Sequence, residues 1–303
     1  MPFIKQPDFN CHYESQHNGE VPIICIHGNF GSWRYWQPFF QHLPEGYCAY
    51  APDLRGCGDS DIADENYDIQ TLSDDVLFFA NQLKLEKFHL VGHSLGGAVA
   101  QELAGHVAER VLSLTLVAPA PAEGLASLEK SNISSQFFSA KNIFQFLDNM
   151  GMKKMLFTAT FKKTMPGLKN KPAYLNNVVS DAIKMDIKAF NGFYETLKTW
   201  RGNDLLKRFT FPVLIIHGSL DTVVPLKPLE RMQQQIQGCR LHIFEKIGHS
   251  PQLESPTAFN NLVNGFIQDS SSIQVINRTT APEQPNLAAI LKRKLKQFLS
   301  KFN

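Results

Sequence analysis

Short runs of apolar, often β-branched residues alternate along this chain with longer segments whose apolar positions recur at a helical period. The short runs predict buried strands at residues 21–26, 47–51, 88–92, 112–117, 213–217 and 241–244. The longer segments predict helices at residues 36–42, 71–83, 95–107, 226–235 and 256–268. Strands that alternate with helices are typical of βαβ units. The sequence therefore predicts an α/β fold with a mostly parallel central sheet flanked by helices.

The alternation stops between residues 122 and 206, where only helical segments rich in phenylalanine and methionine are predicted. A segment this long exceeds what a crossover between two strands needs. We therefore expect an all-helical lid, inserted at 122–206, over the C-terminal edge of the sheet, while residues 1–121 and 207–268 form the core. Most apolar side chains of the lid must pack into its own helical core, and we expect some of them to line a ligand pocket as well.

The C-terminal part of the chain changes character twice. Residues 269–286 are polar and contain two prolines, which predicts a linker. Residues 287–303 place leucine and phenylalanine at helical spacing beside five basic residues and no acidic one, which predicts a basic amphipathic helix. Such a helix can pack on its own domain, lie on an anionic membrane surface or dock on a partner protein, and the sequence leaves all three open.

The composition is that of an ordinary globular protein, with 303 residues, 43% hydrophobic residues and a formal net charge of +2. These values disfavour a mainly disordered or fibrous chain. Residues 287–303 carry +5, so the rest of the chain carries −3, which disfavours a general nucleic-acid binder.

Three features bear on the compartment. The chain has no run of eighteen apolar residues that would predict a membrane-spanning helix, and residues 1–20 are too polar for a secretory signal. The five cysteines are an odd number without any C-x-x-C spacing, so we expect reduced thiols. Together these features predict a cytoplasmic protein.

The segment FHLVGHSLGG, residues 88–97, joins an apolar strand to a helix through the pattern G-x-S-x-G. The pattern alone is weak evidence, but its position between a strand and a helix strengthens it. A turn this tight requires small residues on both sides of the serine and holds its Oγ clear of the backbone, and the helix N-terminus favours developing negative charge. We therefore predict that Ser94 is a nucleophile.

A serine hydroxyl needs a base to take its proton, and the base needs an acid to fix its tautomer. Of the ten histidines, His249 is the candidate base because it follows the last predicted strand, at the edge of the sheet where α/β proteins bind ligands. Asp221, just beyond the strand at 213–217, is the candidate acid, although an aspartate in such a loop can also cap its own backbone. The order Ser94, Asp221, His249 is the one expected for this type of sheet.

A tetrahedral oxyanion requires main-chain N–H donors. The first candidate is the amide of Leu95, directly after the nucleophile, and the second lies in the glycine-containing loop after the first long strand. In that loop we select the amide of Asn29, with Phe30 as the second choice. Trp33 and His93, which lie near these donors in the sequence, are candidates for lining the substrate pocket.

The chain resembles the α/β-hydrolase superfamily, in its lid-bearing branch of esterases, lactonases and C–C-bond hydrolases. The resemblance rests on the motifs HGNFGSW (27–33), PDLRGCGDS (52–60), GHSLGG (92–97), PVLIIHGSLDTVVP (212–225) and IGHSPQLESP (247–256). It covers about residues 21–268 without the lid, and it implies no catalytic role for Asp53, Arg55 or Asp59. Epoxide and haloalkane hydrolases of the same fold carry an aspartate at the position of Ser94, so neither activity is expected here.

The sequence contains no H-E-x-x-H motif, no clustered Cys/His spacing, no phosphate-binding loop and no complete G-x-G-x-x-G, so neither a metal nor a cofactor is expected. We expect a serine hydrolase that cleaves a small, largely apolar carboxylic ester, thioester or lactone through an acyl-enzyme. A C–C-bond hydrolase or an acyltransferase would use the same triad. Two further alternatives are a ligand receptor that retains the triad and an accessory protein docked through residues 287–303.

Overall fold

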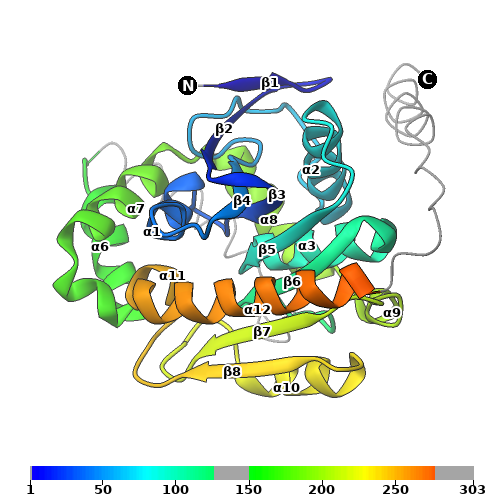
Figure 1. Cartoon of the computed structure of the whole chain (residues 1–303). Helices are drawn as coiled ribbons and strands as arrows, with labels where there is room; N and C mark the ends of the chain where they lie inside the picture. Colours follow the sequence, from blue (N-terminus) through cyan, green and yellow to red (C-terminus); the bar gives the residue numbers. More distant parts are fainter. Residues whose placement is uncertain (1, 126–149, 277–303) are drawn as a thin grey trace.

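A central sheet of eight strands organises the molecule (Figure 1). The computed structural model describes residues 2–125 and 150–276 of the 303-residue chain. The strands lie in the spatial order β1-β2-β4-β3-β5-β6-β7-β8. Their bounds are Phe3–Lys5 (β1), Asn10–His17 (β2), Gly19–Ile26 (β3), Gly46–Pro52 (β4), Phe88–His93 (β5), Val111–Val117 (β6), Val213–Gly218 (β7) and Arg240–Phe244 (β8).

The six predicted strands correspond to β3 to β8, and their bounds differ from the predicted ones by at most two residues. All neighbouring pairs among these six strands are parallel. The prediction of an α/β fold with a mostly parallel sheet is therefore confirmed.

Strands β1 and β2 are absent from the prediction. They form an antiparallel pair at one edge of the sheet, and β2 also pairs antiparallel with β4. The buried residues of β2, Cys11 and His12, are adjacent instead of alternating, and the rest of the strand is polar. Strand β2 has neither the apolar run of a buried strand nor the alternation of a half-buried one, so sequence pattern alone misses it.

Helices cover both faces of the sheet. The helices outside the β6–β7 connection are η1 (Trp33–Trp36), α1 (Gln37–Phe40), α2 (Ile69–Gln82), α3 (Leu95–His106), η2 (Ala108–Arg110), α10 (Leu226–Gln235), α11 (Pro251–Glu254) and α12 (Pro256–Ile276). In β3, Ile24 and Ile26 belong to the hydrophobic core under α2 and α3, while Ile23 and Cys25 belong to the core under α1 and α12. Figure 1 shows α12 crossing the sheet beside β6, which it contacts.

Between β6 and β7 the described residues form helices and connecting turns without a strand. These helices are α6 (Lys153–Thr164), η3 (Pro166–Asn170), α7 (Pro172–Lys184), α8 (Ile187–Thr199) and α9 (Asn203–Leu206). Helix α7 is tied to the loop after β3 through Asp181, a buried carboxylate that accepts hydrogen bonds from Ser32 Oγ at 2.5 Å and from Arg34 at 3.0 Å. We call residues 150–206 the helical insert. Residues 126–149, which also belong to the predicted lid, lie outside the described residues.

Helix α12 continues past the predicted end at residue 268 to Ile276. The linker prediction is therefore wrong for residues 269–276. Within this polar stretch the hydroxyls of Ser270 and Ser271 are satisfied inside the helix, because they donate to the carbonyls four residues earlier at 2.8 and 3.0 Å. Residues 277–286 and the predicted basic amphipathic helix at 287–303 lie outside the described residues.

Within residues 2–125 and 150–276, no helix combines the length and the apolar character that a membrane crossing requires. All five cysteines are free thiols, and four of them are buried.

Candidate active site

Ser94 occupies the junction between β5 and α3. Its backbone has φ 53° and ψ −116°, in the left-handed half of φ space that residues with a side chain rarely adopt. The conformation is held by a hydrogen bond from Ser94 N to Val117 O of β6 at 3.0 Å. Small residues are needed around it, since a Cβ on Gly92 would lie 2.4 Å from the carbonyl oxygen of Gly96. This strained turn is the geometry that presents a serine side chain at the end of a strand.

The side chain of Ser94 lies against the loop that follows β3. A Cβ on Gly28 would come within 2.8 Å of Ser94 Cβ, and a Cβ on Gly96 would come within 2.4 Å of His27 O. The two glycines therefore allow the loop and the β5–α3 turn to pack backbone against backbone. His27 reinforces the loop, because its Nε2 accepts from Leu54 N at 2.9 Å while its Nδ1 donates to Gly28 O at 2.8 Å.

Asp221 and His249 form a hydrogen-bonded pair on the loops after β7 and β8. Asp221 Oδ2 lies 2.8 Å from His249 Nδ1, and the carboxylate side chain is fully buried. Its other oxygen accepts from the amides of Val223 and Val224 at 2.7 and 3.1 Å. Burial alone would raise the pKa of Asp221, but the His249 ring and these two amides outweigh it, and the net pKa is lowered. An ionised Asp221 requires a proton on Nδ1 of His249, which leaves Nε2 as the basic nitrogen.

Two main-chain contacts fix the loop that carries His249. His249 N donates to Thr164 O of the helical insert at 2.9 Å. His249 O accepts from Nε2 of His93 at 2.9 Å, and the two imidazole rings have centroids 4.9 Å apart. Because His93 directly precedes Ser94, this contact brings the His249 loop to the end of β5.

His93 itself is buried, and burial lowers its pKa to about 3, so it is neutral and donates from Nε2. Its ring stacks on Tyr35 at 5.6 Å and holds the His249 loop. His93 therefore supports the His249 loop, and its assignment to the substrate pocket stays a prediction. Trp33, the other candidate pocket residue, is half-buried, and its amide donates to Asp53 Oδ1 at 2.6 Å.

The candidate oxyanion donors differ in availability. The amide of Phe30 donates to the side-chain oxygen of Asn29 at 2.9 Å, so it is already engaged. Leu95 is the first residue of α3, where amides lack an acceptor within the helix. Among residues 2–125 and 150–276, no acceptor is hydrogen-bonded to the amides of Asn29 and Leu95. The geometry favours Asn29 over Phe30 as the partner of Leu95.

Two acidic residues that sequence reasoning did not assign to the site support its loops. Asp53 accepts from the Trp33 and Asp59 amides and from His12, and thereby fixes the loop after β4 beside the loop after β3. Glu254 accepts from three amides around His249 and the helical insert. Both lie inside motifs quoted above, which is the signal that the sequence offered for them.

His12, Asp53 and Asp59 also form a group of potential metal ligands within the described residues, with one donor atom of each within 4.8 Å of the others. The oxygens of Asp53 already accept from His12 Nδ1 at 2.7 Å and from two amides at 2.6 and 3.0 Å. Such a carboxylate is saturated by hydrogen bonds. This donor set therefore fits an internal anchor between loops better than a metal centre.

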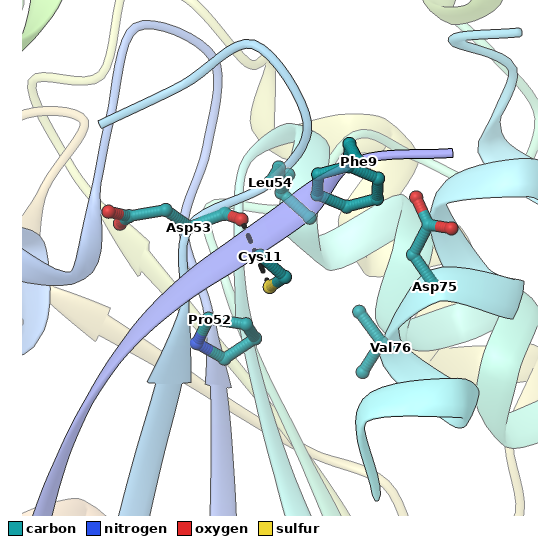
Figure 2. Close-up of a pocket in the computed structure, with 7 residues that line it drawn as sticks. All are labelled: Phe9, Cys11, Pro52, Asp53, Leu54, Asp75 and Val76. Atoms are coloured by element: carbon teal, nitrogen blue, oxygen red, sulfur yellow. Dashed lines mark hydrogen bonds between the residues drawn. The ribbon is translucent and has the colours of Figure 1, made fainter. Parts of the chain in front are cut away.

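A small cavity lies between β2, the end of β4 and α2 (Figure 2). There the thiol of Cys11 donates to the carbonyl oxygen of Asp53 at 3.6 Å, and the Asp53 carboxylate points away from the thiol. Burial raises the pKa of the Cys11 thiol far above its usual value, so the thiol stays protonated. Ser94, Asp221 and His249 do not line this cavity. Its lining residues are Phe9, Cys11, Pro52, Asp53, Leu54, Asp75 and Val76.

Known proteins with similar sequences include several hydrolases. The chain is 29% identical over 266 residues to 3-oxoadipate enol-lactonase 1 of Acinetobacter baylyi, an alignment that covers 82% of this chain and 89% of that protein. It is 26% identical over 279 residues to a 2-hydroxy-6-oxo-6-phenylhexa-2,4-dienoate hydrolase of Burkholderia cepacia, covering 86% and 92% of the two chains.

Solved structures agree on the fold. The enol-lactonase from Burkholderia xenovorans LB400 superimposes with a TM-score of 0.74 at 20% identity, over 88% of this chain and all of that one. A thermophilic esterase from Thermogutta terrifontis gives a TM-score of 0.76 at 18% identity, over 89% and 99% of the two chains. The family model of the alpha/beta hydrolase fold matches residues 21–256, which include Ser94, Asp221 and His249. The chain belongs to the α/β-hydrolase family.

Proposed function

We propose that this chain is a serine hydrolase that cleaves a small, largely apolar carboxylic ester, thioester or lactone through an acyl-enzyme. The observation that carries the proposal is the 2.8 Å hydrogen bond between Asp221 and His249, on a loop that His93 holds beside the strained turn of Ser94. A buried acid, an oriented imidazole and a serine on a strained turn are the parts that acyl transfer needs.

In the proposed reaction His249 Nε2 takes the proton of Ser94 Oγ while Oγ attacks the substrate carbonyl. Asp221 holds the imidazole in the required tautomer and stabilises the positive charge that develops on it. The amides of Leu95 and Asn29 donate to the oxyanion of the tetrahedral intermediate. The same histidine returns its proton to the leaving alcohol, thiol or ring oxygen, and then activates the water that clears the acyl-enzyme.

An apolar substrate is supported by the side chains that meet the oxyanion loop. Phe30 packs edge-on against Phe157 of α6, with ring centroids 5.1 Å apart, and stacks on Phe190 of α8 at 5.4 Å. Both partners belong to the helical insert. We propose that the insert acts as a lid over Ser94 and that its aromatic side chains select apolar acyl groups.

The proposal is tested with p-nitrophenyl esters from acetate to laurate and with an enol-lactone, comparing wild type with Ser94→Ala. We expect wild-type hydrolysis to fall on the order of 10⁶-fold in kcat in the variant. Ser270→Ala is the matched control, because this buried serine donates only to Phe266 O within α12 and should leave kcat unchanged. Hydrolysis that survives in Ser94→Ala would contradict the proposal.

A second candidate is hydrolysis of a C–C bond, because relatives at 26% identity are named as 2-hydroxy-6-oxo-6-phenylhexa-2,4-dienoate hydrolases. The same three residues would serve that reaction. The test is incubation with that dienoate, following the loss of its absorbance, beside the ester panel. Turnover of the dienoate that far exceeds every ester and lactone would favour the second candidate.

A further inference from the structure

Glu254 is a buried carboxylate whose three hydrogen-bond donors are all main-chain amides. It is the last residue of α11 and is 4% exposed. Oε2 accepts from Gly167 N at 2.8 Å and from Gly248 N at 3.1 Å, while Oε1 accepts from Ser250 N at 3.0 Å. The sequence-based assignment of catalytic, oxyanion and pocket residues leaves this side chain without a role.

The three amides come from two parts of the molecule. Gly248 and Ser250 directly flank His249, whereas Gly167 belongs to η3 of the helical insert, 87 residues away from Glu254 in the chain. Both glycines are required by the close approach. A Cβ on Gly167 would lie 2.9 Å from Glu254 Cβ, and a Cβ on Gly248 would lie 2.3 Å from Thr164 O and 3.1 Å from Glu254 Oε1.

We infer that Glu254 is a positioning residue: its carboxylate locks the His249 loop to the helical insert and so fixes the imidazole for proton transfer. The inference rests on the proposed function of His249 as the base. A carboxylate suits this task because both of its oxygens accept, whereas a glutamine would turn an NH₂ group towards an amide donor. The buried negative charge also favours the imidazolium that forms on His249 during the reaction.

Opposing effects act on the pKa of the Glu254 carboxyl. Burial raises the pKa of its carboxyl above the usual value, and the three amides together with the His249 ring oppose that shift. The other titratable groups that face His249 are Asp221 at 2.8 Å and the neutral His93 ring at 4.9 Å, and His217 lies behind Asp221 at 3.8 Å. Of these groups, only Asp221 and Glu254 carry a negative charge towards the imidazole.

The experiment compares Glu254→Gln and Glu254→Asp with Glu102→Gln in the full chain. Glu102 is the matched control, since it is also a buried carboxylate and accepts from Trp200 Nε1 at 2.9 Å and His106 at 3.0 Å, away from His249. We expect Glu254→Gln to lower kcat on the order of 10- to 100-fold with KM nearly unchanged, because it misplaces the base without removing substrate contacts.

The acid limb of the kcat/KM profile should move to lower pH in Glu254→Gln, because loss of the negative charge favours the neutral imidazole. Glu254→Asp should restore that limb while recovering only part of kcat. Glu102→Gln should leave kcat and the acid limb at wild-type values. A Glu254→Gln variant that folds and shows wild-type kcat and pH profile would overturn the inference.

Two further measurements keep the inference testable. If Glu254→Gln does not fold, Gly167→Ala pushes one donor away without altering the carboxylate, and the same fall in kcat is expected. Amide hydrogen exchange at Gly248, His249 and Ser250 reports the lock without any substrate. If the wild-type chain hydrolyses none of the substrates and amide exchange is still faster in the Glu254 variants, the lock is supported and the proposed function is rejected. Unchanged exchange would reject the lock.

Discussion

Replacing Gly28 with alanine tests how closely the loop after β3 and the turn of Ser94 must pack. The new methyl group would lie 2.8 Å from Ser94 Cβ and 2.9 Å from His93 Nδ1, whereas ordinary contacts begin near 3.4 Å. Relief of this overlap requires a movement of about 0.6 Å in the nucleophile or in the loop that carries Asn29. Because a misplacement of about 1 Å can cost 10²-fold in rate, we expect kcat to fall on the order of 10- to 100-fold.

The assay is ester hydrolysis combined with thermal unfolding. Overpacking of this kind costs about 1–3 kcal/mol of unfolding free energy, which lowers the melting temperature by a few degrees and leaves the protein folded at 25 °C. The matched control is Gly265→Ala in α12, where a new methyl group meets no atom within 4 Å. That variant should keep its kcat and gain about 0.5–1 kcal/mol. Wild-type kcat in Gly28→Ala would refute the argument from close packing.

Three other predictions concern carboxylates. Asp221→Asn should lower kcat by about 10³- to 10⁴-fold with KM little changed, because the tautomer of His249 would no longer be fixed. A stopped-flow ester assay measures this change. A loss in kcat of tenfold or less would contradict the prediction. Because the folded-state pKa of Asp221 is lowered, its stabilisation is present above the unfolded pKa near 3.9 and disappears as pH falls through the folded value. In urea unfolding, the free energy of unfolding of the wild type should therefore fall below about pH 4, and it should fall less in Asp221→Asn. Parallel plots of unfolding free energy against pH for the two proteins would argue against this prediction. Asp181→Ala leaves Ser32 and Arg34 without their acceptor and should cost about 3 kcal/mol by denaturant unfolding, where a loss under 1 kcal/mol would be inconsistent with this anchor.

Most of the strands that the sequence predicted are largely buried, although the half-buried edge strand β8 was predicted as well. Strands such as β6 (Val111–Val117), buried at every position, are dominated by apolar residues, with Ser113 and Thr115 as the exceptions in β6. Strand β2, next to the edge strand β1, was missed because its burial depends on its neighbours instead of its own pattern. The extension of α12 was missed for a related reason. Ser271 hydrogen-bonds Tyr47 and His89 of the sheet at 3.1 and 3.2 Å, so tertiary contacts stabilise a stretch whose composition is typical of a linker.

The candidate site, too, could be predicted only in part from the sequence. Ser94 and His249 could be selected because parallel strands bring their C-terminal ends to one edge, and chain order alone then suggests which loops meet. Sequence could not select Glu254 in the same way, because its partner Gly167 lies 87 residues away in an insert without strand periodicity. It could not separate Asn29 from Phe30 either, since the difference is one hydrogen bond from the Phe30 amide to the Asn29 side chain.

The hydrogen bond between His249 N and Thr164 O joins two main-chain groups, so its formation does not depend on which side chain stands at position 164. Position 164 of the helical insert can therefore vary in sequence while the attachment of the insert to the His249 loop persists. An engineer who grafts foreign sequence into this insert should thus preserve the backbone path from Thr164 to Gly167 together with Asp181 of α7, and exchange α8 instead. A chimera joined in this way replaces one helix of the insert and keeps the contacts that hold the histidine.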